Sequence, residues 1–151
     1  MRIGSILEDR NAEKRVAITP EIAKKYNSLG FEVLLSKDYG LHLGFDDEKY
    51  KSQGANIFEN EKDILTNSDI ILQLGLPSDD NLSLLKENQN LIGVLNPFLN
   101  KEKLEKLSKK KFKFFEVPIT YNGRSYEEGK KIRLKDAFIA LKTIILYSLI
   151  G

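Results

Sequence analysis

The residue best suited to binding chemistry is Arg15, which follows a polar stretch near the start of the chain. Its guanidinium offers planar pairs of N–H donors that match a carboxylate or a phosphate. Two amide residues, Gln73 and Asn96, lie at or just past the ends of the two most strand-like segments. If those strands share a parallel sheet, all three side chains approach one crevice at its carboxyl edge. These residues are our candidate substrate-binding or small-anion site.

Each of these side chains also has a purely structural interpretation. Arg15 has three acidic neighbours with which it can form a surface ion pair, namely Glu8, Asp9 and Glu13. The amides of residues 73 and 96 can bond the main chain at strand ends, which is a frequent use of such side chains. The sequence leaves both interpretations open.

Composition limits metal and thiol chemistry. The chain has no cysteine, which excludes disulfides, thiol catalysis and cysteine metal sites and fits a reducing cytoplasm. His42 is the sole histidine, so a multi-histidine metal site is excluded, and its glycine-flanked loop favours a solvated ring. The acids Asp46, Asp47 and Glu48 stand at a predicted helix start, where negative charge suits the helix dipole. We therefore expect no metal site.

The overall composition is that of an ordinary soluble globular protein. The 151 residues suffice for one domain with a sizeable core, and 41% are hydrophobic and 30% charged. The 24 basic and 22 acidic residues give a net charge of +2, which offers no general reason to expect nucleic acid as a partner. No apolar run follows a basic start, so no signal peptide is expected.

Motifs that would announce a cofactor or a nucleophile are missing. No two glycines lie two residues apart, so the chain has no G-x-G-x-x-G dinucleotide loop. It likewise has no phosphate-binding P-loop, no G-x-S-x-G elbow and no D-x-D motif. We expect no cofactor to be bound by this chain alone and assign no catalytic residue.

The first twenty residues place Arg15 in a loop. Ile3 and Ile6 belong to a short apolar strand, residues 9–14 are polar, and Thr19-Pro20 starts a helix. Threonine is a good N-cap, and proline suits the first helical position because its missing N–H would be unpaired there. Arg15 is therefore predicted between a strand end and a helix start, where ligands bind in open α/β sheets.

Strand and helix patterns alternate through residues 1–117, which predicts an α/β fold. It is expected to be a Rossmann-like or flavodoxin-like, mostly parallel sheet with flanking helices. The pattern alone names no function. The predicted strands after the first cover residues 31–35, 55–58, 69–74, 91–95 and 112–117, and the predicted helices cover residues 20–29, 46–53, 61–66, 78–86 and 100–109.

Residues 118–151 change in character. A turn-prone stretch and the basic segment Lys130-Lys-Ile-Arg133 precede a helical apolar run over residues 137–150. This run of 14 residues is shorter than the roughly 20 that span a bilayer. The helix either covers the sheet or lies in a membrane interface. A weak membrane-surface contact through residues 130–151 is thus one alternative.

Residues 1–115 resemble the N-terminal domain shared by alanine dehydrogenases and pyridine nucleotide transhydrogenases. The resemblance is carried by Met1-Arg-Ile-Gly4, Arg15-Val-Ala-Ile-Thr-Pro20, Phe45-Asp-Asp-Glu-Lys-Tyr50 and Asp69-Ile-Ile-Leu-Gln-Leu-Gly-Leu-Pro77. In alanine dehydrogenases the arginine matching Arg15 binds the substrate carboxylate. Those enzymes also have a lysine where this chain has Gly75 and a catalytic histidine where it has Asn96. An amide cannot act as a general acid or base, so the resemblance favours the transhydrogenase α subunit.

This resemblance implies cofactors and partners beyond the chain itself. In transhydrogenases a second Rossmann domain binds NAD(H), and hydride passes to NADP(H) on another subunit, coupled to proton translocation. We therefore expect a fragment without autonomous hydride transfer, whose partners are transhydrogenase subunits or a second copy. Its expected location is cytoplasmic and peripheral to the inner membrane.

Residues 116–151 resemble the end of a family 2 glycosyltransferase. The stretches Glu116-Val-Pro-Ile-Thr-Tyr121 and Arg124-Ser-Tyr-Glu-Glu-Gly-Lys-Lys-Ile132 carry this resemblance. It implies that Arg124, Lys130 and Lys131 lie near a sugar phosphate and the membrane surface. The expected domains are thus 1–115 and 116–151, joined by fusion, rearrangement or an assembly artefact, unless one resemblance is accidental. A small-anion or partner-docking module and a glycosyltransferase remnant remain as alternative functions.

Overall fold

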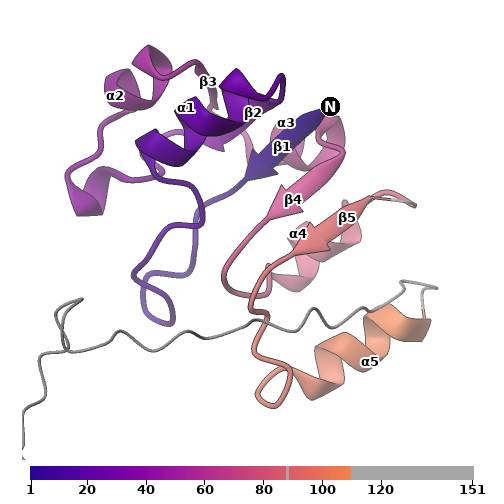
Figure 1. Ribbon diagram of the computed structural model, residues 1–151. Helices are drawn as coiled ribbons and strands as arrows, with labels where there is room; N and C mark the ends of the chain where they lie inside the picture. Colours follow the sequence, from indigo (N-terminus) through magenta and orange to yellow (C-terminus); the bar gives the residue numbers. More distant parts are fainter. Residues whose placement is uncertain (88, 110–151) are drawn as a thin grey trace, which may run out of the picture. The chain divides into compact units, whose positions relative to one another are not determined.

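Five parallel strands form one sheet with the order β3-β2-β1-β4-β5 in the segment of the chain that the structure describes (Figure 1). The structure is a computed structural model, and it describes residues 1–87 and 89–109. It confirms the predicted Rossmann-like α/β class. The strands are β1 (Arg2–Ser5), β2 (Glu32–Ser36), β3 (Ala55–Phe58), β4 (Ile70–Leu72) and β5 (Asn90–Ile92).

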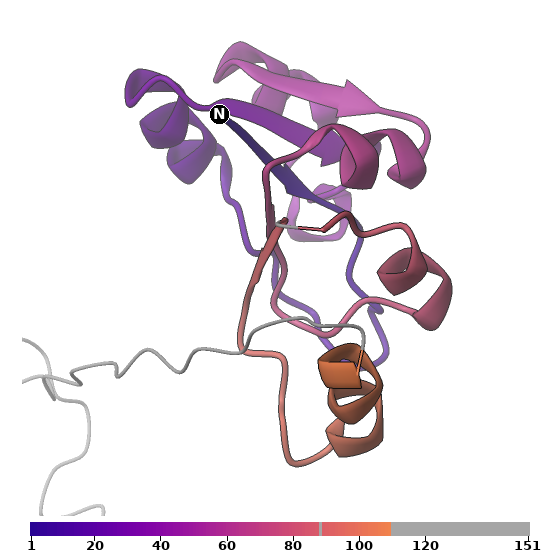
Figure 2. The same cartoon turned by 90° about the vertical axis from the view of Figure 1, so that its right-hand side faces the viewer.

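Helices connect the strands and cover both faces of the sheet (Figure 2). Successive side chains of β2 point to opposite faces, as the pleat requires. Val33 and Leu35 join the core beneath α1, whereas Leu34 packs with Ile64 on α3. The helices are α1 (Pro20–Ser28), α2 (Asp47–Ser52), α3 (Glu61–Asn67), α4 (Asp79–Ser83) and α5 (Lys101–Lys109), with one 3₁₀ turn, η1 (Leu41–Leu43).

The sequence signals at the start of α1 are confirmed. The Thr19 hydroxyl accepts the N–H of Ile22 at 3.4 Å, and Pro20 is the first helical residue. Gly30 ends the helix with a φ of +83°, a left-handed conformation that glycine adopts without steric cost. The loop that carries Arg15 therefore ends at a capped helix start, which defines where the loop joins α1.

The two strands on the β4 side are shorter than predicted. β4 covers residues 70–72 and β5 covers residues 90–92, whereas the apolar runs predicted 69–74 and 91–95. Gly93 follows β5 directly, and only glycine fits there because a Cβ would lie 1.8 Å from the main-chain oxygen of Gln73. Leu95 and Asn96 then adopt left-handed φ values of 51° and 47°. This backbone turns the chain away from the sheet.

Two further local expectations differ from the structure. The predicted loop 38–45 contains η1, which the glycines at both ends concealed in the sequence. The helix predicted over residues 100–109 begins one residue later, at Lys101, and the side-chain amide of Asn100 donates to the carbonyl of Leu95 at 2.8 Å. On α5, Leu107 is buried and Leu104 is half-buried.

Several expectations concern residues outside the described ranges. These are the strand 112–117, the apolar helix within 134–150, the junction near 115 and the basic residues Arg124, Lys130 and Lys131. Within residues 1–87 and 89–109, no helix has the length and apolar character needed to cross a membrane.

Candidate functional site

The candidate site lies where the sheet reverses its strand order. β1 pairs with β2 on one side and with β4 on the other, so the loops that leave β1 and β4 flank the reversal. In open α/β sheets the crevice outside the carboxyl ends of such strands is the usual ligand position. Arg15 belongs to the loop after β1, and Gln73 begins the loop after β4.

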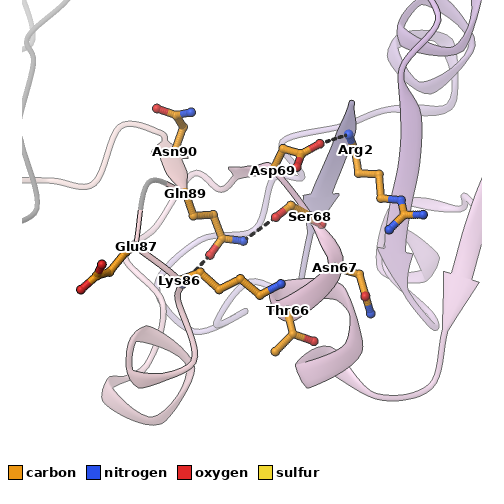
Figure 3. A pocket seen from close by; sticks show the side chains of 9 residues that line it. All are labelled: Arg2, Thr66, Asn67, Ser68, Asp69, Lys86, Glu87, Gln89 and Asn90. Carbon is orange, nitrogen blue, oxygen red and sulfur yellow. Dashed lines mark hydrogen bonds between the residues drawn. The ribbon is translucent and has the colours of Figure 1, made fainter.

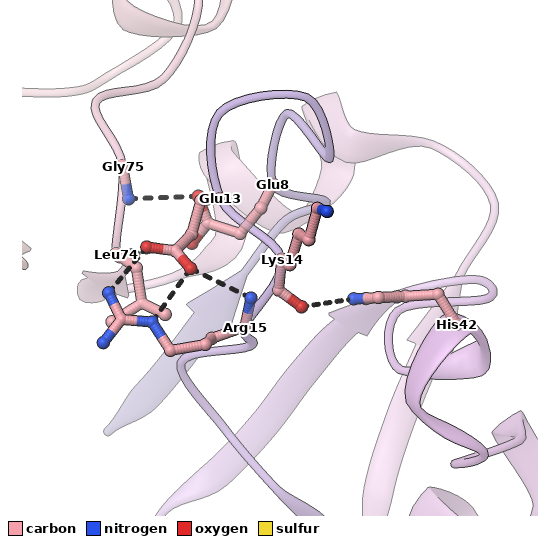
Figure 4. A network of polar contacts seen from close by, with 7 residues as sticks. All are labelled: Glu8, Glu13, Lys14, Arg15, His42, Leu74 and Gly75. Carbon is pink, nitrogen blue, oxygen red and sulfur yellow. Dashed lines mark hydrogen bonds and ion pairs between the residues drawn. The ribbon is translucent and has the colours of Figure 1, made fainter. Parts of the chain in front are cut away.

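Arg15 forms an ion pair with Glu13 (Figure 4). Its Nη2 donates to Glu13 Oε2 at 2.7 Å, while its Nε and its main-chain N–H both donate to Oε1 at 2.9 Å. The hydrogen bonds from Arg15 lower the pKa of the Glu13 carboxyl to about 2. Among the three acidic partners considered for Arg15, the structure thus selects Glu13. The Arg15 side chain remains 71% exposed.

Glu8 links the two loops that flank the strand-order reversal (Figure 4). Its carboxylate accepts the main-chain N–H groups of Leu74 at 2.6 Å and Gly75 at 3.0 Å. Burial raises the pKa of this half-buried carboxyl, and the negative charge of Glu13 acts in the same direction. The hydrogen bonds from Leu74 and Gly75 oppose that rise. Sequence reasoning missed this contact, and 66 residues separate Glu8 from Leu74.

The Gln73 side chain is bonded to the loop after β1. Only 2% of the residue is exposed. Its Oε1 accepts the N–H of Ile6 at 3.2 Å, and its Nε2 donates to the carbonyls of Ile6 at 3.1 Å and Leu7 at 3.4 Å. The amide therefore makes the strand-end hydrogen bonds that the sequence left as an alternative, and ligand contact would require it to exchange some of them.

Asn96 lies farther along the sheet edge than Arg15 and Gln73. It follows β5, the outermost strand on that side of the described sheet, and it is exposed. Its main-chain N–H donates to Val94 at 2.6 Å, and its carbonyl accepts from Leu99 and Asn100. Among the described residues, its side-chain amide makes no hydrogen bond, either to Arg15 or to any other residue. The structure therefore brings Arg15 and Gln73 to adjoining loops, and the loop that carries Asn96 bonds the loop after β4, because the N–H of Leu95 donates to the carbonyl of Leu74 at 3.1 Å.

A buried tyrosine fixes the loop that carries Arg15. The hydroxyl of Tyr39 accepts the N–H groups of Ala17 at 3.1 Å and Ile18 at 3.3 Å. It donates to the hydroxyl of Ser5 at 2.7 Å, which in turn donates to the carbonyl of Leu72. Burial raises the pKa of Tyr39 to about 12. The tyrosine thus remains a neutral structural link between β1, β4 and the loop.

The residues considered for metal binding have structural contacts. His42 is exposed, and its Nε2 bonds the carbonyl of Lys14 at 2.8 Å. Asp46 caps α2 by accepting the N–H of Lys49 at 2.8 Å, as expected for an acid at a helix start. Within the described residues, no group of three or more histidine or acidic side chains is placed to hold a metal ion.

A polar hollow of about 340 Å³ lies at the opposite edge of the sheet (Figure 3). Its lining includes Arg2, Asp69 and Asn90, which lie at the amino ends of β1, β4 and β5. Two of its polar side chains are paired within the protein: Asp69 accepts the N–H of Arg2 at 2.7 Å, and Gln89 donates to the carbonyls of Leu65 and Ser68. This hollow is therefore distinct from the ligand edge predicted by the strand order.

The described residues do not fit a dinucleotide. A Rossmann phosphate site needs a short glycine-rich turn that lets the main chain approach the pyrophosphate at a helix N-terminus. Here residues 6–19 separate β1 from α1, contain no glycine and carry the acids Glu8, Asp9 and Glu13. Negative charge at this turn opposes a pyrophosphate, so no cofactor step is derived from this domain.

Comparison with known proteins identifies the family of this chain. Residues 5–122 match the family model described as "Alanine dehydrogenase/PNT, N-terminal domain". The chain belongs to this family. The match runs past residue 115, where the sequence suggested a junction, and the comparisons lend no support to a glycosyltransferase-like tail.

The relatives include both branches of the family. The chain is 35% identical to an NAD(P) transhydrogenase α-subunit protein of Rickettsia prowazekii over 76% of this chain and 31% of that protein. It is 30% identical to alanine dehydrogenase 1 of Staphylococcus aureus over 71% of this chain and 28% of that protein. It thus spans about a third of the length of these relatives.

The similar solved structures also include one transhydrogenase and one alanine dehydrogenase. A transhydrogenase from Sinorhizobium meliloti matches with a TM-score of 0.62 and 29% identity, over 68% of this chain and 30% of that chain. An L-alanine dehydrogenase matches with a TM-score of 0.66 and 26% identity, over 72% and 30% respectively.

Proposed function

We propose that this chain is an N-terminal domain of the transhydrogenase α-subunit type, which lacks hydride transfer of its own and contacts a small anion through Arg15. The observation that carries the proposal is the Glu8 contact to Leu74 and Gly75. In this contact the Glu8 carboxylate lies in the loop where a dinucleotide would need a glycine-rich turn. Its two donors include the N–H of Gly75, the position at which an alanine dehydrogenase has its lysine.

Two positions argue against alanine oxidation. Gly75 has no side chain, and its N–H already donates to Glu8. Asn96 carries an amide, which cannot act as a general acid or base near neutral pH. Among the described residues, none supplies the lysine and histidine that the alanine dehydrogenase resemblance requires at these positions. We therefore propose that NAD(H) and NADP(H) act only in a larger assembly to which this domain belongs.

The Arg15 contact is the second element of the proposal. The guanidinium is exposed, it follows a central strand, and it lies at the edge where open α/β sheets bind ligands. A planar small anion is the ligand class that a guanidinium recognises through paired hydrogen bonds. Gln73 and Asn96 are secondary candidates in this proposal. Gln73 would have to release hydrogen bonds to Ile6 or Leu7, and the Asn96 side chain would have to reach the ligand from the loop after β5.

We further propose that the partner is a nucleotide-binding transhydrogenase subunit or domain, which holds the chain in the cytoplasm beside the membrane. Two relatives are named as subunits, and the chain spans about a third of their length or less. The exposed apolar side chains at the end of β5 and after it supply a surface for this contact. They are Ile92, Val94, Phe98 and Leu99.

A titration of sodium pyruvate or sodium phosphate into isotopically labelled protein, followed by NMR, tests the anion contact. We expect millimolar binding that Arg15→Gln abolishes. Arg10→Gln is the matched control, because Arg10 lies in the same loop but donates to the carbonyl of Asp38. Binding that survives Arg15→Gln, or that is equally lost in Arg10→Gln, would contradict the proposed contact.

A further inference from the structure

One carboxylate occupies three donors of Arg15. Glu13 accepts the main-chain N–H, Nε and Nη2 of that residue at 2.7–2.9 Å. The Glu13 side chain is 20% exposed, whereas that of Arg15 is 71% exposed. The carboxylate thus lies on the protein side of the pair and the guanidinium on the solvent side.

The guanidinium has two edges that can each hold a planar anion. The side edge consists of Nε and Nη2, and the end edge consists of Nη1 and the second hydrogen of Nη2. Glu13 bonds the side edge. Among the described residues, no acceptor bonds Nη1, so the end edge is available for an external ligand.

The backbone around this pair is held from several directions. Glu13 donates its N–H to the carbonyl of Asp9 at 2.8 Å, and Lys14 accepts from His42. Ala17 donates to the Tyr39 hydroxyl. Since the main chain is tethered before and after Arg15, the remaining freedom is that of its long side chain, which Glu13 restricts.

We propose that Glu13 is a positioning residue that orients the end edge of the Arg15 guanidinium toward a small anion. This inference rests on the proposed anion contact of Arg15. A guanidinium held in its binding orientation loses less side-chain freedom when the ligand arrives, which favours binding. The competing possibility is that Glu13 simply neutralises Arg15 and competes with the ligand.

The two possibilities predict opposite changes in anion affinity when Glu13 is replaced. For Glu13→Ala, positioning predicts that pyruvate binds about threefold to tenfold more weakly, the range expected from freeing one long side chain. Competition predicts tighter binding, because a negative charge has been removed beside the guanidinium. Glu48→Ala is the matched control: it also removes a carboxylate paired with a cation, Lys51, and both side chains are exposed on α2. Tighter binding by Glu13→Ala, or equal weakening by Glu48→Ala, overturns the proposal.

A second measurement tests Glu13 without a ligand. The Nε–H signal of Arg15 in an NMR spectrum should exchange slowly with water in the wild-type protein and broaden or disappear in Glu13→Ala. The same exchange rate in both proteins overturns the positioning role. If the wild-type protein binds neither pyruvate nor phosphate, the anion contact fails, while this signal still decides whether Glu13 orders Arg15.

Discussion

The amide of Gln73 bonds both main-chain groups of Ile6. Oε1 accepts the N–H of Ile6 at 3.2 Å, and Nε2 donates to its carbonyl at 3.1 Å. One side chain after β4 thereby replaces the main-chain pairing that a longer strand would have provided for the residue after β1. Both groups of Ile6 are buried with the amide, so the contact fixes where the two central strands end.

Replacing Gln73 with leucine should therefore destabilise the fold. The variant keeps a similar volume but leaves a buried N–H and a buried carbonyl unpaired, which costs about 2–4 kcal/mol of unfolding free energy in total. Urea unfolding followed by circular dichroism measures this loss. Gln53→Leu is the control, since the Gln53 side-chain amide donates only to the exposed Ser52 hydroxyl among the described residues. Equal stability of Gln73→Leu and wild type would contradict the structural role.

Glu8 predicts a particular dependence of stability on pH. Its pKa is raised in the folded protein, mainly by burial, so the folded state binds the proton more tightly than the unfolded state. The contribution of Glu8 to stability should therefore fall as pH rises from its ordinary pKa of 4.5 through the raised value. Urea unfolding of wild type and Glu8→Gln across pH 4.5–7 isolates this contribution. A difference that grows in favour of wild type with rising pH would contradict the prediction.

Glu13 should make the opposite contribution to the pH dependence of stability, and at lower pH than Glu8. Its pKa falls to about 2 because Arg15 donates to the charged carboxylate. The contribution of the pair to stability is thus complete above the ordinary pKa of 4.5 and is lost as pH falls toward 2. Above pH 5, the orientation of Arg15 should not change with pH. An NMR titration of the Glu13 side-chain carboxyl carbon measures the midpoint directly, and a midpoint near 4.5 would show that the pair does not persist in solution.

Gly93 should not tolerate a side chain. A Cβ would lie 1.8 Å from the main-chain oxygen of Gln73, and main chain cannot easily move aside. We expect Gly93→Ala to lower the unfolding free energy by about 1–3 kcal/mol through overpacking. Gly75→Ala is the control, because its nearest contact is the Glu8 carboxylate at 3.1 Å. Thermal unfolding that ranks Gly75→Ala below Gly93→Ala in stability would show that the close approach of β4 and β5 is not maintained.

The exposed apolar residues after β5 predict a change in association without a change in stability. Phe98 is 95% exposed and Leu99 is 81% exposed, so serine at either position removes no buried contact. Phe98→Ser and Leu99→Ser should unfold at the same urea concentration as wild type. Both should bind more weakly to a nucleotide-binding transhydrogenase subunit in a pull-down. A loss of stability in these variants would show that the two side chains pack within the protein.

Local signals made much of the fold predictable. Thr19, Pro20 and Gly30 mark the bounds of α1 through capping and backbone conformation, which depend on a few neighbouring residues. The strand 55–58 was predicted with the bounds that the structure has. Each of these features is encoded within a short window, so a single sequence suffices to find it.

The details of the site depend on contacts between distant residues. Glu8 meets Leu74 across 66 positions, and Gln73 meets Ile6 across 67. Their residue types suggest surface charge and strand-end bonding but do not reveal the partner. Likewise, the requirement for glycine at position 93 comes from the main-chain oxygen of Gln73, which no local sequence pattern reveals. The sequence identified Arg15 and its possible acidic partners, and the structure was needed to choose Glu13.

The most direct test of the central claim is a calorimetric titration of NADH into this chain alone. The turn after β1 presents Glu8 to Leu74 and Gly75 and contains no glycine for a pyrophosphate. We therefore predict no binding heat at NADH concentrations up to the millimolar range. Binding with a micromolar dissociation constant would contradict the claim that this domain lacks a dinucleotide site of its own.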